Sequence, residues 1–432
     1  MSQVYWVGGA PAVAQITKVT VGGTLAGETF TISIGGEVIA THTDGTTNIA
    51  DTVAALVAAF NESTCPYAAG IIAATDDDPD VVLTSEVDGM PFVITINTPG
   101  GSATLEQATP TASAGPNHWD DGNNWSDGGP PDDSDSVIID DPDARILWGM
   151  DQNALTSLVL HLNTFSLLGL RRDIFITSAD GTAHSAHRPE YRYQWLSAGF
   201  AEINIGKLTG GNIPAIGRCK IEQNQADASV VVHHTGNASL DPNLPSVRFL
   251  TSGISVTDGF DILINDAPGG VGFGLDRDGD VECVLGDVKV RGANSKVDYC
   301  VYSSSGYLTI WWDAWIQEAG TTRIYSGIQS PSTLPAMVVN GGTVYLEPYM
   351  LMAGLTINDS GTVYETNVVL ESDEITTVNL NRGGHLDMTG SRGTKTYTTV
   401  NQEKGSTLVR NDLLTIGTWN LPADQDYTMA LT

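Results

Sequence analysis

The sequence is poor in cysteine and has no long apolar run. Its 432 residues include four cysteines, which lie far apart and show no CxxC spacing. This pattern argues against a zinc ribbon and a disulfide framework, because both need clustered cysteines. No stretch approaches the about 18 uninterrupted apolar residues of a membrane-spanning helix. We therefore expect no membrane association.

The first residues lack the features of a secretory signal. The segment MSQVYWVGGAPAV has neither a basic stretch nor a continuous apolar core, and a signal peptide needs both. The sequence therefore predicts a protein that folds in the cytoplasm of the cell that makes it.

Basic side chains are scarce, especially in the first part of the chain. The formal net charge is −31, and residues 1–170 contain only two basic side chains, Lys18 and Arg145, among many Asp and Glu. This excess of negative charge repels the phosphate backbone of DNA and RNA, so nucleic-acid binding is disfavoured. The simplest role of the charge is solubility at high copy number, and binding of divalent cations or of a basic partner is the alternative.

Motifs of common enzymes are also missing. The chain has no Gly-x-Ser-x-Gly and no phosphate-binding loop, which are signatures of serine hydrolases and nucleotide-binding proteins. Glycosidases use a pair of carboxylates, but acidic residues are so frequent here that no pair stands out. We therefore expect no enzymatic activity and no catalytic residue.

The sequence between residue 15 and about residue 110 shows the pattern of a small α+β domain. In 28–34, apolar residues alternate with Thr and Ser, which predicts a half-buried strand. Gly35-Gly36 supplies a tight turn into a second strand over 37–42. Further strands are predicted at 70–75, 80–86 and 91–97.

One amphipathic helix is predicted within this pattern. Apolar residues recur at helical spacing over 49–60, and Asp51 falls in the first turn. Thr46 and Thr47 offer hydroxyl groups that can cap the helix. We expect this helix to cover the apolar side of the sheet.

A region rich in Pro, Gly, Asn and Asp follows over 109–143. It contains NHWDDGNNWSDGGPPDDSDSVIID, and YWVGG occupies residues 5–9. Together these segments resemble a module of phage and bacterial surface proteins, in which such an opening precedes a W…NW pair, a Gly/Pro turn and a strand that begins D-x-V. The residues that match are Trp119, Asn124-Trp125-Ser126, Gly128-Gly129-Pro130 and Asp135-Ser136-Val137-Ile138.

The two halves of this motif lie more than a hundred residues apart, whereas the family pattern places them almost side by side. A domain whose termini are close together can enter a surface loop without disturbing its host. The sequence therefore predicts a split capping module, formed by 1–11 and 117–143, that carries a small inserted α+β domain over 12–116. The inserted segment itself resembles small modules of phage structural proteins.

The clearest regularity lies near the C-terminus. A glycine before an apolar segment recurs every 19 to 23 residues, at Gly320, Gly342, Gly361, Gly384 and Gly405. A repeat of this length without helices is typical of stacked β-coils. It predicts an elongated right-handed β-helix, or β-solenoid, over 144–412, with 413–432 as a C-terminal cap or docking segment.

The spacings between Gly206 and Gly320 are less even. A mainly β chain with regular hairpins would show the same turn residues. Domains of the β-sandwich type are therefore the alternative fold.

Three alternating carboxylates form the candidate metal site. Asp276, Asp278 and Asp280 can converge on a hard cation, as in a calcium loop. Their glycine stands fourth, where the EF-hand pattern requires it sixth. Calcium is thus the one candidate cofactor.

Three tryptophans in YLTIWWDAWIQ form the candidate contact site. Strand alternation sends Trp311 and Trp315 to one face and Trp312 to the other. We expect these rings to divide between core packing and contact with a second subunit, and a sugar-stacking platform is the alternative.

The resemblance implies a bacteriophage virion component, either a capsid decoration protein or head fibre, or a tail fibre. It implies capsid or tail proteins as partners and a homo-oligomer, with a trimer as the first guess. One alternative is a tail spike that binds or depolymerises a host surface glycan. Another is a bacterial surface adhesin, which the missing signal sequence disfavours.

Overall fold

The chain is mainly β, as predicted. This computed structural model describes residues 2–34, 37–45, 47–65, 68–98, 102–141, 143–163, 167–168, 175–177, 183–185, 196–206, 218–224, 227–236, 245–251, 259–274, 283–301, 312–326, 332–347, 350–366, 373–391 and 394–422. Within these ranges there is one α-helix, and the rest is strands, turns and one short 3-10 turn, η1 (Gly122–Asn124).

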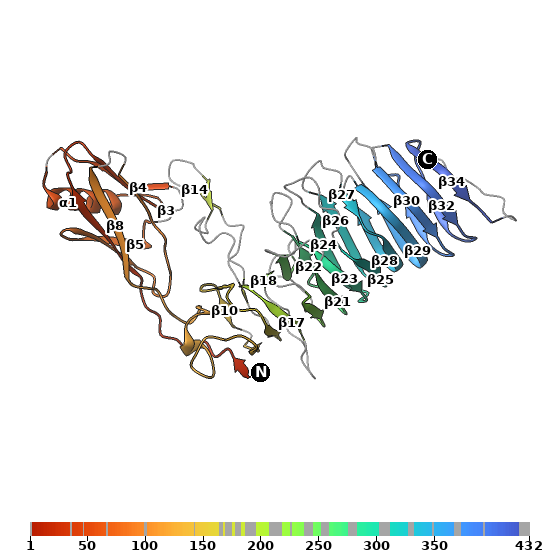
Figure 1. The fold of residues 1–432 in the computed structure, drawn as a ribbon, viewed down its shortest axis with the longest axis horizontal. Coiled ribbons are helices and arrows are strands. Elements are labelled where there is room, and N and C mark those ends of the chain that lie inside the picture. Colours follow the sequence, from red (N-terminus) through yellow and green to blue (C-terminus); the bar gives the residue numbers. More distant parts are fainter. Residues whose placement is uncertain are drawn as a thin grey trace.

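Most strands belong to one large sheet whose pairings are parallel. Figure 1 shows the strands from β17 to β34 one after another along the longest axis of the molecule. The sheet contains β1 (Gln3–Tyr5), β9 (Ser136–Ile139), β10 (Arg145–Ile146), β11 (Asp151–Gln152), β12 (Leu158–Leu162), β13 (Leu167–Leu168), β16 (Leu196–Ala198), β17 (Phe200–Ile205), β18 (Arg218–Gln223), β19 (Ser229–Val232), β20 (Val247–Thr251), β21 (Phe260–Ile264), β22 (Val271–Phe273), β23 (Leu285–Val290), β24 (Lys296–Val301), β25 (Ala314–Gln317), β26 (Thr321–Ser326), β27 (Ser332–Leu334), β28 (Met337–Leu346), β29 (Met350–Glu365), β30 (Asp373–Leu380), β31 (His385–Asp387), β32 (Lys395–Gln402), β33 (Thr407–Val409) and β34 (Leu414–Asn420).

The glycine repeat coincides with the pairing register of this sheet. Gly342 lies directly opposite Gly361 in the pairing of β28 with β29, and Thr362 lies opposite His385 in the next pairing. Residues one repeat apart therefore lie opposite each other on neighbouring parallel strands. Hairpin-built sandwiches pair antiparallel, so the parallel register argues against the sandwich alternative for this part.

Side chains at equivalent positions form continuous inward columns. One column consists of Val288, Trp315, Met337, Leu355, Val378, Val400 and Trp419, each opposite the next in register. All but the last are fully or almost fully buried. Trp419 on β34 is only partly buried, because no described strand covers it on the far side.

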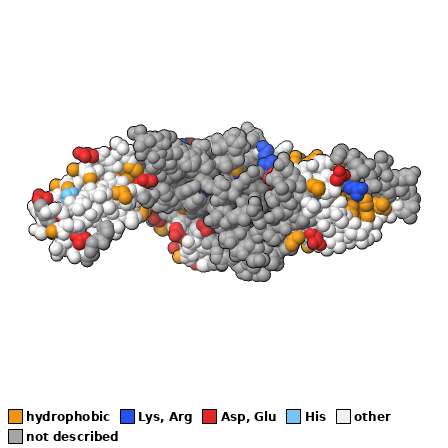
Figure 2. Space-filling view, turned by 90° about the horizontal axis from the view of Figure 1, so that it is seen from above, with side chains coloured by type: hydrophobic (Ala, Val, Ile, Leu, Met, Phe, Trp, Pro, Cys, Tyr) orange, Lys and Arg blue, Asp and Glu red, His pale blue; other side chains and the backbone are white. Residues whose placement is uncertain are grey.

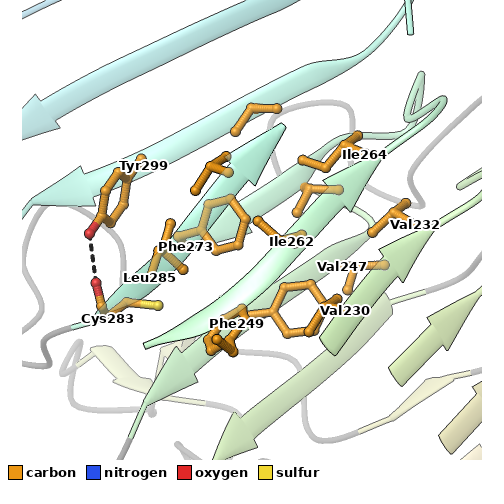
Figure 3. Close-up of a cluster of buried hydrophobic side chains, with 14 of the residues drawn as sticks. Val230, Val232, Val247, Phe249, Ile262, Ile264, Phe273, Cys283, Leu285 and Tyr299 are labelled. Atoms are coloured by element: carbon orange, nitrogen blue, oxygen red, sulfur yellow. Dashed lines mark hydrogen bonds between the residues drawn. The ribbon is translucent and has the colours of Figure 1, made fainter. Parts of the chain in front are cut away.

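The buried side chains of the large sheet form one contiguous hydrophobic core. Figure 3 shows its central part, where Phe249 and Phe273 stack with ring centroids 5.9 Å apart. The Tyr299 hydroxyl donates a hydrogen bond of 2.6 Å to the carbonyl oxygen of Cys283. Cys283 is a free cysteine, and burial raises the pKa of its thiol to about 12. It is therefore a small apolar residue of the core and not a reactive thiol.

The tryptophans of the split motif pack together at the start of this sheet. β1 pairs parallel with β9, so that Val4 lies opposite Val137. The ring of Trp125 makes edge contacts with Trp6 and Trp119, at centroid distances of 4.9 and 4.8 Å. Its Nε1 donates a hydrogen bond of 2.7 Å to the carbonyl oxygen of Trp119. The two halves of the motif are thus in contact and join the same core.

Residues 16–111 form a second unit with a core of its own. Its elements are β2 (Ile16–Gly23), β3 (Thr29–Ile34), β4 (Glu37–Thr43), α1 (Ile49–Asn61), β5 (Ile72–Asp77), β6 (Asp80–Ser85), β7 (Thr95–Asn97) and β8 (Ala103–Thr111). They form two antiparallel sheets, with strand orders β5-β6-β2-β8 and β4-β3-β7. The buried helix residues Val53, Leu56 and Phe60 belong to this core, which confirms the predicted covering helix.

The sequence-based boundaries need three corrections. The helix is capped by the Asn48 side chain, which accepts from the Ala50 amide, and not by Thr47. The other predicted capping residue, Thr46, lies outside the described residues. The strand expected at 91–97 begins only at Thr95. Two strands, β2 and β8, were missed because their apolar alternation is weaker and β8 is largely exposed.

The C-terminal segment continues the large sheet. β34 pairs parallel with β32, and Leu414 and Ile416 pack partly against the main core. Residues 414–420 therefore form one more strand of the sheet. The segment 423–432 lies outside the described residues. One further antiparallel pair, β14 (Phe175–Thr177) and β15 (Ala183–Ser185), stands apart from the sheet.

Candidate functional site

The candidate calcium residues Asp276, Asp278 and Asp280 lie outside the described residues. Asp287, the nearest described carboxylate that follows them, is exposed on β23, where its amide donates to Asp261 Oδ1 over 2.8 Å. In the described part of the chain, no group of three or more His, Cys, Asp and Glu side chains is placed to hold a metal ion. The calcium site thus stays a prediction.

The candidate contact tryptophans occupy the core where the structure describes them. Trp311 lies outside the described residues, whereas Trp312 and Trp315 are 0% and 1% exposed. Their rings contact each other at 5.3 Å, and Trp312 Nε1 donates to the carbonyl oxygen of Ala336 over 3.2 Å. Two such rings have no surface to offer a glycan or a second subunit, so that expectation is wrong for them.

The burial of both tryptophans is explained by the position at which strand β25 begins. β25 begins at Ala314, so the alternation assumed for residues 311–315 does not extend back to Trp312. Both rings can then face the same core. Trp315 Nε1 lies 3.4 Å from Gln317 Oε1, which also accepts from Thr322. The polar atoms of these indoles are therefore satisfied inside the protein.

A half-buried aromatic row lies on the outward side of the sheet. Tyr345 and Tyr364 stack with centroids 5.3 Å apart, and His385 continues the row at 6.3 Å from Tyr364. An ion pair between Arg323 Nε and Glu347 Oε1, at 3.1 Å, lies beside it. A row of partly exposed aromatic rings can contact a ligand by stacking. Sequence reasoning missed it, although Tyr345 and Tyr364 each end a GTVY segment of the repeat.

Asparagine ladders also run along the stack. Asn358 Nδ2 donates to Asn340 Oδ1 over 2.7 Å, and Asn381 donates in turn to Asn358. A second ladder joins Asn379, Asn401 and Asn420, in which each amide donates to the previous carbonyl over 2.7 Å. Such ladders stabilise strands that stack in register. They act structurally and require no ligand.

Three buried titratable side chains of the described residues lie together: Glu365, Lys395 and Tyr397. Each of these side chains is 1% exposed. The Tyr397 hydroxyl donates a 2.6 Å hydrogen bond to Glu365 Oε1, and Lys395 Nζ lies 4.0 Å from Glu365 Oε2. Burial raises the pKa of Glu365 and lowers the pKa of Lys395, and each partner opposes the shift of the other. Burial also raises the pKa of Tyr397 well above its usual value.

Acidic side chains dominate the N-terminal part of the surface. On the face shown in Figure 2 they are scattered over that part, whereas the clearest Lys and Arg side chains lie toward the C-terminal part. In the large sheet, Lys289 Nζ forms an ion pair with Glu318 Oε1 at 2.7 Å. No helix in the described ranges is long and apolar enough to cross a membrane.

These observations give the molecule an extended sheet and a continuous core. Comparison of the chain with protein-family models, with curated proteins and with solved structures finds no significant match in any of the three.

Proposed function

We propose that the chain is a structural component of a bacteriophage virion, either a capsid decoration protein or head fibre, or a tail fibre. The observation that carries this proposal is the long stack of parallel strands around one apolar core. A stack of this kind extends in one direction and presents a rigid surface, which suits display on a particle. The asparagine ladders along the strands stabilise the stack.

The fold that we propose for the large sheet is a right-handed β-helix. The parallel register supports it, because residues about 20 positions apart lie directly opposite each other over several successive strands. Wider steps before residue 320, such as Val271 opposite Val297, fit coils with longer loops. Each coil would then bury its inward column against the next coil.

We further propose that residues 12–116 are a domain inserted into the split capping module. The two ends of this segment lie close together, because Val13 N donates to Ala114 O over 2.8 Å. This proximity supports an insertion. The segments on either side meet as well, because Trp6 forms a bridge with Trp125. In Figure 1 the N-terminus lies beside β10 and not beside α1, as an insertion requires.

Removal of residues 12–116 tests the insertion. We expect a chain in which Pro11 is joined to Asn117 by a short Gly-Ser linker to keep the β-type circular dichroism and the cooperative unfolding of the remainder. The reason is that the two cores are separate clusters. The excised segment should fold alone, with the far-ultraviolet spectrum of an α+β protein. If either piece is unfolded or aggregates, residues 12–116 are an integral part of one domain.

As a virion component, the chain would bind capsid or tail proteins and form a homo-oligomer, with a trimer as the first expectation on a symmetric particle. It would be made in the host cytoplasm. The alternative is a tail spike that binds or depolymerises a host glycan, and the aromatic row of Tyr345 and Tyr364 is the surface feature that favours it.

Incubation of the purified protein with capsular polysaccharide of the host separates these functions. We expect no release of reducing ends and no unsaturated sugars, because a display component acts by shape and assembly. Either product would contradict a purely structural role. The variants Tyr345→Ala and Tyr364→Ala then report on binding, because a glycan-binding row would lose retention on immobilised polysaccharide in both.

A further inference from the structure

The buried cluster of Glu365, Lys395 and Tyr397 has no place in the proposed display function. Glu365 is the last residue of β29, and Lys395 is the first residue of β32. β29 pairs with β30, and β30 pairs with β32, so these two side chains reach toward each other from strands that are not neighbours. They meet inside the protein, where both are 1% exposed.

An ordinary buried ion pair stabilises a protein only when good geometry repays the loss of hydration. Here the closest nitrogen–oxygen distance is 4.0 Å, too long for a hydrogen bond. Glu365 Oε2 is buried and accepts no hydrogen bond from the described residues. A charge on Glu365 Oε2 is therefore poorly compensated, and conversion of this carboxyl group to an amide would remove that charge.

We propose that Lys395 Nζ and the Glu365 side-chain carboxyl form an intramolecular isopeptide bond. In this condensation the Nζ lone pair attacks Cδ of Glu365, the new N–Cδ bond forms, and one C–O bond of the carboxyl group breaks. The departing oxygen leaves as water with one proton from the amine and one from the carboxylic acid. No oxidant, reductant or other reactant is required.

The site favours this step in two ways. Burial raises the pKa of Glu365 and lowers the pKa of Lys395, so both groups are shifted toward the neutral forms that can react. The Tyr397 hydroxyl donates to Glu365 Oε1 over 2.6 Å, which withdraws electrons from Cδ and stabilises the oxyanion that develops during attack.

Proximity supplies the remaining rate acceleration. Groups fixed by a folded protein react with effective molarities of about 10⁵–10⁸ M when they approach to about 3–3.5 Å. Lys395 Nζ lies 4.0 Å from the carboxyl oxygen Oε2, and the reaction requires Nζ to approach Cδ of the same carboxyl group. Tyr397 is thus a positioning and activating residue, and the reacting atoms belong to Glu365 and Lys395.

The product would be a covalent link between one turn of the stack and the next. β34 is the last described strand, and ends of stacked sheets are where local unfolding begins. A bond between Glu365 and Lys395 closes a loop that contains β30 and β31. It would therefore oppose the separation of the last turns under heat or denaturant.

Mass spectrometry of the intact full-length chain tests the proposal. After prolonged incubation of the folded protein, we expect a mass lower than the sequence mass by one water molecule. Proteolysis should yield one branched peptide in which Lys395 and Glu365 are joined, with no tryptic cleavage after Lys395. The sequence mass, with both residues in separate unmodified peptides, would overturn the proposal and leave an ordinary ion pair.

Three variants locate the bond. Lys395→Met should restore the sequence mass, whereas Lys404→Met, at an exposed position on the same part of the stack, should keep the loss of water. Tyr397→Phe should slow the appearance of the branched peptide without abolishing it. Loss of water that persists in Lys395→Met would place the modification elsewhere and overturn the assignment. Because the wild-type mass is measured independently, a Lys395→Met chain that fails to fold leaves the test valid, and neither result bears on the proposed virion role.

Discussion

Replacement of Trp125 by alanine is expected to lower the free energy of unfolding by about 3–5 kcal/mol, the usual cost of removing a fully buried aromatic ring. Trp125 is 2% exposed and lies between Trp6 and Trp119, each within 5 Å of its ring centre. Its loss also removes a hydrogen bond to the backbone of Trp119. Since these rings join the two halves of the split motif, Trp125→Ala should detach the N-terminal strand from the sheet.

Trp419→Ala is the matched control. Trp419 ends the inward column of the large sheet and is only partly buried, with the Arg410 guanidinium 5.5 Å from its ring. We expect it to cost about 1–2 kcal/mol, because less apolar area leaves water. Urea unfolding followed by far-ultraviolet circular dichroism measures both variants. Equal shifts of the two midpoints would show that the tryptophan cluster at the start of the sheet is not a special point of stability.

The second large effect is expected for Gly383→Ala. Gly383 has a φ of +87°, and a Cβ added there would lie 2.0 Å from the carbonyl oxygen of Asp359 on the preceding turn. The left-handed backbone costs an alanine about 1–2 kcal/mol. The collision adds about 1–3 kcal/mol, because the two turns must move apart. We expect a total loss of about 2–5 kcal/mol of stability.

Gly405→Ala isolates the contribution of the collision. Gly405 has nearly the same φ, +86°, but the nearest atom to its added Cβ is Arg382 Cγ, at 3.6 Å. This variant should therefore lose only the cost of the backbone strain. The difference between the two midpoints of thermal unfolding measures how closely one turn packs on the next. A Gly383→Ala variant as stable as Gly405→Ala would contradict the close stacking of these turns.

The sequence predicted those features that depend on local periodicity. The recurrence of Gly320, Gly342 and Gly361 predicted the repeat, because each glycine lies where the backbone of the preceding repeat approaches closely. The helix over Ile49–Asn61 was equally predictable from its apolar spacing. Both signals repeat within a few residues or at a fixed period, so one sequence is enough to detect them.

Features that depend on contacts between distant residues were not predictable in this way. The burial of Trp312 depends on where β25 begins, and the approach of Lys395 to Glu365 depends on how three strands are stacked. Lys395 and Glu365 look like surface charges in the sequence, since either type is rarely buried. The asparagine ladders were missed for a different reason. Asn340, Asn358 and Asn381 follow the repeat, but asparagine is also the usual residue of turns.

The proposed role as a virion component is tested most directly by quantitative mass spectrometry of particles purified on a density gradient from a culture that produces the protein. We predict that peptides from both 12–116 and 394–422 sediment with the major capsid protein, at a constant ratio across the particle peak. Peptides that remain in the soluble fraction, with none above background in the particle peak, would contradict the proposal.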